Sequence, residues 1–208
     1  ETPQAPAGAR IPIELLSLAL DLHLVVSGFR LPALSRFLQA PILKTKLAEL
    51  PPAINYTETL MLCGYYQANI LRSMVDAWRN TFKLLKAELL VFDHAPVAQL
   101  AGHIHGTPGI RLGSSFAITP QRTPFPRYVF WQPSGKYATR LRNSETLCLG
   151  VANDVLAQLN MKPVPSLADL FHTNTSFIST HADFDVYGQR SNVHYVGTLL
   201  DNKLGASP

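Results

Sequence analysis

The sequence has few cysteines and few charged residues. Its only two cysteines, Cys63 and Cys148, lie far apart and fit no metal-ligand or redox spacing, so we interpret both as small buried hydrophobes. With sixteen prolines and no disulfide framework, a cytoplasmic localisation is expected. Charged residues make up 15% of the 208 positions and hydrophobic ones 47%. This composition indicates a globular protein with a real core and excludes disorder except at the ends.

Several functional signatures are also missing. The most apolar stretch, 11–29, contains Glu14, Asp21 and His23, which exclude a membrane-spanning helix or a signal sequence. There is no Gly-x-Ser-x-Gly elbow for a hydrolase nucleophile, and no Gly-x-Gly-x-x-Gly or Walker-type loop for phosphates. The net charge is +4, but the basic residues are scattered and form no run. Nucleic acid is therefore not expected as a partner.

The stretch 88–113 carries the clearest pattern in the chain. It predicts a strand through Phe92, a polar turn, a helix that ends at Gly106, and a second short strand. A continuous apolar run before a turn is typical of a strand that is buried on both faces in a parallel sheet. Asp93 and His94 follow that strand directly. Because open α/β sheets bind ligands at the carboxyl ends of their strands, these two residues are the first candidates for chemistry.

Helical and extended segments alternate along the rest of the chain. Helices are predicted at 11–20, from Asn55 with Glu58 as a capping pair, at 67–86, from Ser144, and from Ser166 with Asp169; extended segments are predicted at 22–26, 38–41, 176–179 and 195–200. This order predicts an α/β fold with a Rossmann-like open, mostly parallel sheet and helices on both faces. The expected organisation is a loose segment at 1–10, one domain at 11–200, and a linker or tail at 201–208.

The candidate residues allow more than one interpretation. Asp93 either caps the following helix or orients and charges a histidine that acts as general base. His103 and His105 lie two positions apart at a helix end and point in different directions, so no metal site is expected with His94. The aromatic, proline-rich segment 114–133 is either a wall packed on the core or a binding surface.

Several short motifs resemble one family in their order and spacing. They are Leu38-Gln39-Ala40-Pro41, Asp76-Ala77-Trp78-Arg79, Val91-Phe92-Asp93-His94-Ala95-Pro96, Leu112-Gly113-Ser114-Ser115-Phe116, His181-Ala182-Asp183-Phe184-Asp185-Val186-Tyr187-Gly188 and Tyr195-Val196-Gly197. Across about 22–200 the chain resembles the N-terminal, acceptor-binding half of GT-B glycosyltransferases. It is most similar to bacterial enzymes related to UDP-glucuronosyl, macrolide and sterol glycosyltransferases.

The resemblance implies roles for particular residues. Asp93 matches the aspartate that supports a general-base histidine in inverting transferases. The resemblance also implies an acceptor-binding surface, for which the candidates are His94, Ser114, Ser115, Phe116, Phe125 and Trp131. The first strand and histidine-bearing loop of the family are not recognisable, and His23 lies in a strand-like run, so the base is expected to be absent from this chain. A donor domain is also not recognisable, and this chain alone is expected to be inactive.

Two functions from different classes follow. The first is the acceptor-binding half of an inverting, metal-independent glycosyltransferase that has no cofactor and acts on a small-molecule or lipid acceptor. The nucleotide sugar would then bind only with a C-terminal domain. The alternative is a non-catalytic, glycosyltransferase-like α/β interaction module that works with a partner chain. Peripheral membrane association and homo- or hetero-oligomers are compatible with either function.

Overall fold

The computed structural model describes residues 52–128, 135–173 and 175–197, together with 40, 41 and 43 and the backbone of 15–17 and 37–39. The chain divides into two compact units, Glu1–Ile42 and Leu43–Pro208. This boundary falls inside the predicted domain 11–200. The predicted end segments 1–10 and 201–208, and the predicted strand 22–26, lie outside the described residues.

In the first unit, two short strands pair in parallel. They are β1 (Leu15–Ser17) and β2 (Phe37–Gln39), and Leu16 is paired with Leu38. The extended segment predicted at 38–41 is confirmed in part by β2. The helix predicted at 11–20 is wrong at 15–17, because pairing with a distant strand overrides the helical spacing of the apolar residues.

The second unit contains a four-stranded parallel sheet. Its strands are β3 (Leu90–Phe92), β4 (Gly109–Gly113), β5 (Ser176–Ile178) and β6 (His194–Tyr195), hydrogen-bonded in that order. All three strand pairs are parallel. The predicted α/β class with a Rossmann-like open sheet is therefore confirmed.

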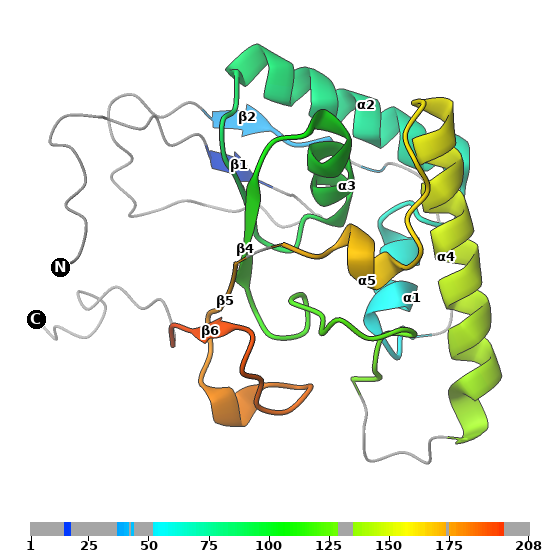
Figure 1. Ribbon diagram of the computed structural model, residues 1–208, viewed down its shortest axis with the longest axis vertical. Coiled ribbons are helices and arrows are strands. Elements are labelled where there is room, and N and C mark those ends of the chain that lie inside the picture. The colour runs from blue at the N-terminus through cyan, green and yellow to red at the C-terminus, as the bar shows by residue number, and fades with distance from the viewer. Residues whose placement is uncertain are drawn as a thin grey trace, which may run out of the picture. The chain divides into compact units, whose positions relative to one another are not determined.

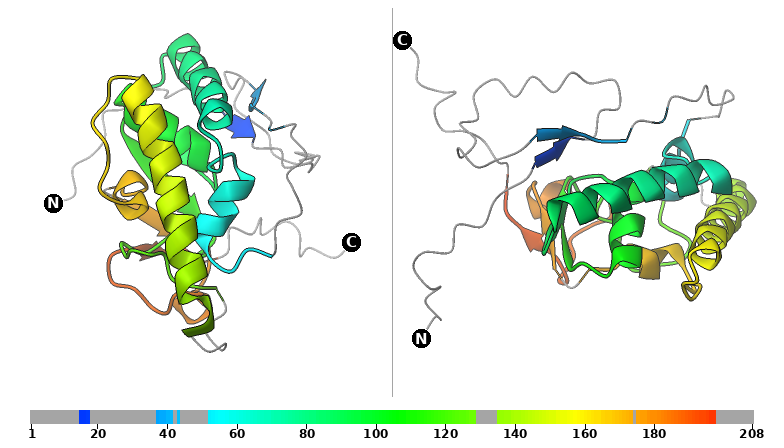
Figure 2. Two further views of the ribbon diagram at one scale, coloured as in Figure 1. Left: turned by 90° about the vertical axis from the view of Figure 1, so that its right-hand side faces the viewer. Right: turned by 90° about the horizontal axis from the view of Figure 1, so that it is seen from above.

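Five helices pack beside this sheet in the part of the chain that the structure describes. They are α1 (Tyr56–Leu62), α2 (Ala68–Leu85), α3 (Pro96–His105), α4 (Ala138–Gln158) and α5 (Leu167–Leu170), with short 3-10 turns at Gly135–Tyr137 and Ala182–Phe184. In Figures 1 and 2 the helices lie on one side of the sheet. The expectation of helices on both faces is thus met on one face within the described residues.

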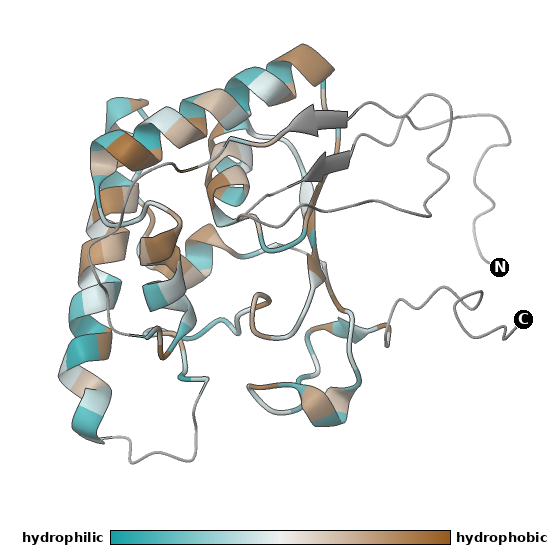
Figure 3. Cartoon of the chain, turned by 180° about the vertical axis from the view of Figure 1, so that it is seen from behind, coloured by the Kyte–Doolittle hydropathy of each residue, from teal (hydrophilic) through white to brown (hydrophobic). Residues whose placement is uncertain are grey.

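Local capping explains where α1 and α5 begin. The Asn55 side chain accepts a hydrogen bond from the Glu58 backbone N–H at 3.1 Å, and Ser166 does the same for Asp169. Both predicted capping pairs are confirmed. The helix predicted from Ser144 begins earlier, at Ala138. Figure 3 shows hydrophobic and hydrophilic positions alternating along α2 and α4, as expected for helices with one buried face.

The core lies between α2, α3, α4 and the covered face of the sheet. On α2 the buried residues are Leu71, Val75, Trp78 and Phe82, which belong to the predicted apolar face. Gly102 lets α3 approach the sheet, because a Cβ there would lie 2.9 Å from Leu90 Cδ1 and 3.0 Å from Phe92 Cζ. None of the helices in the described ranges has the length and apolar character needed to cross a membrane.

Side chains of the sheet alternate between a covered and an uncovered face. Leu90 and Phe92 are buried against the helices, whereas Val91 between them is 58% exposed. The expectation that this strand is buried on both faces is therefore wrong at Val91. The reason is that β3 is an edge strand of this sheet, and its uncovered face has no described helix on it.

Arg111, on the covered face of β4, is a buried cation. It is only 4% exposed, and its guanidinium donates hydrogen bonds to the carbonyl oxygens of Phe171 (2.8 Å) and Ala117 (2.7 Å). Its backbone N–H donates to the carbonyl of Thr175. Burial lowers the pKa of Arg111 from its usual value, and no described carboxylate pairs with it. Arg111 therefore ties the segment before β5 to the middle of the sheet.

Candidate functional site

The candidate site begins where β3 and β4 end. The two strands are adjacent and parallel. Asp93-His94 and Ser114-Ser115-Phe116 therefore emerge at the same end of the sheet, where the carboxyl ends of the strands lie. The rings of His94 and Phe116 lie 5.2 Å apart between centroids. His94 adopts a left-handed backbone conformation with φ of 38°. The structure thus brings together five of the residues that the sequence singled out.

An aromatic wall continues from this edge. The ring of Phe116 contacts that of Tyr128 at 6.1 Å, and Tyr128 contacts Tyr187 at 6.4 Å. The Tyr187 hydroxyl donates to the Phe116 carbonyl at 3.0 Å, and the hydroxyls of Tyr128 and Thr59 are 3.1 Å apart. We call Phe116, Tyr128 and Tyr187 the aromatic wall. Phe116 is 37% exposed, so the wall has a face that a ligand can contact.

The loop between β5 and β6 holds this wall in place. The Val186 N–H donates to Ser115 Oγ at 3.3 Å, which explains why Ser115 is buried. Asp185 accepts hydrogen bonds from Arg190 Nε (2.9 Å) and the Tyr195 hydroxyl (2.7 Å). Because the Asp185 carboxylate is fully buried and paired, the loop is a fixed part of the site.

The electrostatics of Asp93 and His94 are linked. Partial burial raises the pKa of Asp93, and the neighbouring His94 lowers it. Burial lowers the pKa of His94, and Asp93 raises it. The Nε2 atom of His94 is buried and has no hydrogen-bond partner among the described residues. This arrangement favours a neutral imidazole beside a carboxylate that is exposed at the strand end.

Other predicted site residues lie differently. Ser114 is exposed next to Gly113, and its carbonyl accepts hydrogen bonds from the N–H groups of Ala117 and Ile118. Phe125 is completely buried and packs edge-on against Tyr56 at 5.8 Å. Its ring therefore supports the site from the core instead of facing solvent. Trp131 lies outside the described residues.

The cysteines and histidines offer no metal centre in the described part of the chain. No three His, Cys, Asp or Glu side chains converge there on a point that could hold a metal ion. Cys63 and Cys148 are free and buried, as predicted, and burial raises the pKa of the Cys63 thiol to about 11. Both thiols are therefore protonated and unreactive at neutral pH.

Sequence reasoning missed two members of the aromatic wall as site residues. Tyr128 belongs to the aromatic segment that we noted, but Tyr187 was noted only as part of the motif 181–188 and was not a candidate site residue. The structure places the loop after β5 beside Phe116, where the Tyr187 hydroxyl donates a hydrogen bond to the Phe116 carbonyl. A periodic pattern gives no signal for such a contact, since the two residues are far apart in sequence.

Comparison with known proteins leaves the site to be interpreted from its own geometry. The chain matches no protein-family model, and no curated protein shows significant sequence similarity to it.

Proposed function

We propose that this chain is the acceptor-binding half of an inverting, metal-independent glycosyltransferase that moves a sugar from a nucleotide-sugar donor to an acceptor hydroxyl. The observation that carries the proposal is the position of Asp93. It lies at the carboxyl end of a parallel strand, beside the partly buried His94, whose pKa burial lowers, and the ring of His94 contacts Phe116 of the aromatic wall. A carboxylate in that position suits the support of a general-base imidazole.

The aromatic wall favours an apolar acceptor. Phe116, Tyr128 and Tyr187 present rings next to one another, and the polar atoms of the two tyrosines are already engaged or shielded by burial. Ring faces of this kind bind flat or aliphatic bodies through burial of apolar surface. An acceptor lying on Phe116 would place a hydroxyl near the end of β3.

One observation favours the alternative, a non-catalytic binding module. No hydrogen bond joins Asp93 to any histidine in the described ranges, and the nearest imidazole belongs to its chain neighbour His94. An aspartate without a partner base can shape a ligand site without taking part in chemistry. Under this alternative the aromatic wall binds a ligand, and Asp93 contributes only charge.

Transfer assays with the full natural gene product separate the two functions. Radiolabelled UDP-glucose, UDP-glucuronate and dTDP-rhamnose would be offered with a panel of phenolic and aliphatic alcohols. Asp93→Asn should lower kcat by about a hundredfold with little change in acceptor KM. Asp154→Asn, on the exposed side of α4, is the matched control and should leave kcat unchanged. Unchanged turnover in Asp93→Asn would overturn the role of Asp93.

The acceptor surface has its own test. Phe116→Ala should raise the acceptor KM about tenfold, because an apolar contact worth about one order of magnitude is removed. Phe184→Ala removes an equally large ring that is 72% exposed elsewhere in the described chain, and should not change KM. Acceptor binding without any sugar transfer, lost in Phe116→Ala only, would support the non-catalytic alternative.

A further inference from the structure

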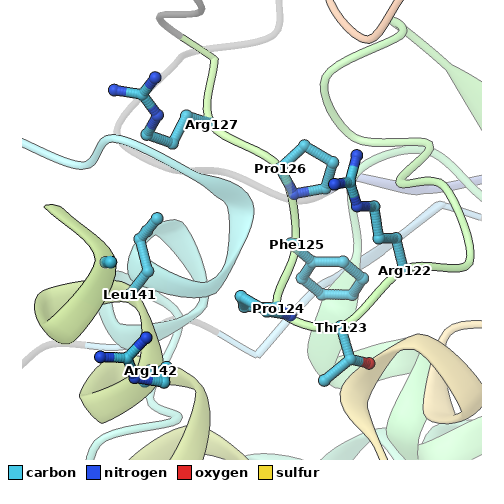
Figure 4. Close-up of a pocket in the computed structure, with 9 residues that line it drawn as sticks. Arg122, Thr123, Pro124, Phe125, Pro126, Arg127, Leu141 and Arg142 are labelled. Atoms are coloured by element: carbon cyan, nitrogen blue, oxygen red, sulfur yellow. The ribbon is translucent and has the colours of Figure 1, made fainter. Parts of the chain in front are cut away.

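A pocket lies between the loop 122–127 and the first turns of α4, and Asp93 does not line it. It has a volume of about 550 Å³, within the range of small-molecule sites. Its lining consists of Arg122, Thr123, Pro124, Phe125, Pro126, Arg127, Ala138, Leu141 and Arg142. Figure 4 shows Arg127, Leu141 and Arg142 along one side and Arg122 on the other, with Pro124 and Phe125 between them.

The charge of this pocket is one-sided. Three arginines line it, and no aspartate or glutamate of the described ranges does. The sequence has the same bias, because no acidic residue occurs between Asp93 and Glu145, whereas six basic residues do: Arg111, Arg122, Arg127, Lys136, Arg140 and Arg142. Lys136 adds to the charge nearby, since Lys136 Nζ and Arg127 Cζ lie 5.7 and 5.8 Å from the centre of the Tyr137 ring.

Two of the lining arginines have no carboxylate partner in the part of the chain that the structure describes. Arg122 and Arg142 are exposed, and neither forms an ion pair with a carboxylate of the described residues; Arg142 makes one long contact, 3.4 Å, to the Thr139 hydroxyl. Arg140 differs, because Glu58 pairs with it at 2.6 Å. Burial raises the pKa of Glu145, and this carboxyl group does not line the pocket.

The floor of the pocket is apolar. Pro124 and Pro126, which are partly exposed, form it together with Leu141, which is 8% exposed, whereas the side chain of Phe125 has no exposed surface that a ligand could contact. An arginine fork binds a phosphate or carboxylate through paired hydrogen bonds, and an apolar floor buries a hydrocarbon body. A ligand that has both an anionic group and a hydrocarbon body should therefore bind the pocket more tightly than a simple anion or a neutral hydrocarbon.

We propose that the pocket formed by the loop 122–127 and the start of α4 binds a phosphate-bearing amphiphile, with Arg122 and Arg142 supplying the positive charge that attracts the phosphate and Pro124, Pro126 and Leu141 lining the space for its apolar body. The phosphate can come from a soluble alkyl phosphate or from a membrane phospholipid. This inference goes beyond the proposed glycosyltransferase function, since it uses neither Asp93 nor the aromatic wall. Its test reads binding alone and is independent of sugar transfer.

The experiment compares octyl phosphate, below its micellar concentration, with inorganic phosphate and 1-octanol by titration calorimetry. Octyl phosphate should bind at least tenfold more tightly than either reference probe. The double variant Arg122→Gln/Arg142→Gln should weaken its binding by tenfold or more, because charge-assisted hydrogen bonds are lost. Lys83→Gln/Lys162→Gln is the matched control, since it removes the same charge from two exposed lysines outside the pocket. It should change binding less than twofold.

A vesicle arm distinguishes the source of the phosphate. Flotation with phosphatidylglycerol vesicles, and with phosphatidylcholine vesicles as reference, is carried out on the same variants. Arginine-dependent binding of octyl phosphate supports the proposal with a soluble ligand, and arginine-dependent flotation only with phosphatidylglycerol supports it with a membrane lipid. Equal losses in the arginine and lysine double variants, or no loss in the arginine variant in both arms, would overturn it. Circular dichroism of each double variant confirms that both are folded.

Discussion

Gly113 lies against the Asp93 carboxylate so closely that a Cβ at position 113 would be 2.7 Å from Asp93 Oδ1. The end of β4 therefore leaves room for the Asp93 side chain only because it lacks a side chain of its own. Real Cβ atoms do not approach a polar oxygen at that distance, so one of the two groups must move when position 113 changes.

Gly113→Ala should displace the Asp93 carboxylate, and it should destabilise the protein by about 1–3 kcal/mol because the φ of 159° at position 113 is one that residues with side chains rarely adopt. The measurement is the free energy of unfolding in urea. Gly150→Ala on α4 is the control, because nothing lies within 4 Å of a Cβ there and alanine favours the helix by about 0.5–1 kcal/mol. If both variants were stabilised alike, the close approach of Gly113 to Asp93 would be disproved.

The stability of the protein should fall in mild acid because of His94. Burial lowers its pKa in the folded protein, so the unfolded chain holds the proton more tightly. The contribution of His94 to the free energy of unfolding is fully present above the ordinary histidine pKa of about 6.5. It is lost as the pH falls from there toward the lower pKa that His94 has in the folded protein. Asp93 acts in the opposite direction. Because its pKa is raised in the folded protein, the folded state binds the proton of Asp93 more tightly and is favoured as the pH falls through the range in which carboxyl groups titrate.

A variant isolates this histidine. His94→Asn removes the titration and tolerates the left-handed backbone at position 94. Unfolding free energies at pH 8 and pH 5.5 should differ less in His94→Asn than in the wild type. His172→Asn, at an exposed position after α5, should keep the wild-type difference. An identical pH dependence in the wild type and His94→Asn would contradict the prediction.

A bidentate ion pair between Glu58 and Arg140 should stabilise the contact between α1 and α4. Arg140 Nε and Nη2 donate to the two carboxylate oxygens of Glu58 at 2.6 and 2.7 Å, and the Glu58 side chain is only 8% exposed. A double-mutant cycle with Glu58→Gln and Arg140→Gln should give a coupling of about 1–2 kcal/mol.

The exposed pair Arg72–Asp76 on α2 serves as the reference cycle. Its side chains are 29% and 39% exposed, and solvent screens such i, i+4 pairs. Its coupling should stay below about 0.5 kcal/mol. Equal couplings in the two cycles would show that burial of Glu58 adds nothing to the pair.

Asp185 should stabilise the loop that holds Tyr187. Asp185→Asn leaves the nearly buried Arg190 without a charged partner and should cost about 3 kcal/mol. Amide hydrogen exchange should then quicken at Tyr195 and Val196 before it does in α4. Asp183→Asn, two residues earlier and exposed, should change stability by less than about 0.5 kcal/mol.

The sequence predicted the elements whose signals are local. The apolar face of α2, the Asn55 cap and the strand-helix-strand unit that ends in Gly113 depend on residues a few positions apart, and all are present. The strand β1 was missed because its partner lies more than twenty residues away. Propensity and spacing carry no information about such pairing.

The candidate site also contains residues that local sequence signals predict and residues that only long-range contacts place there. Asp93 and His94 could be predicted because they directly follow a strand, and parallel strands place their ends at one edge. Tyr187 could not be predicted, since its loop is held beside Phe116 by hydrogen bonds between residues far apart in sequence, those of Tyr187 with Phe116 and of Val186 with Ser115. Phe125 was assigned to the acceptor surface by its aromatic character, but its neighbours Tyr56 and Phe171 enclose it completely.

Arg111 has a consequence for the order in which the second unit assembles. Its side chain and its backbone N–H both bond to carbonyls of 171–175, about sixty residues later in the chain. A chain that ends after α4 would lack the carbonyls of Phe171 and Thr175, so we expect the charge of Arg111 to stay hydrated and β4 to lack its second neighbour. The arrival of Phe171 and Thr175 allows the guanidinium to be buried and β5 to pair in one step. The sheet should therefore complete late, and the second unit should unfold as one cooperative block.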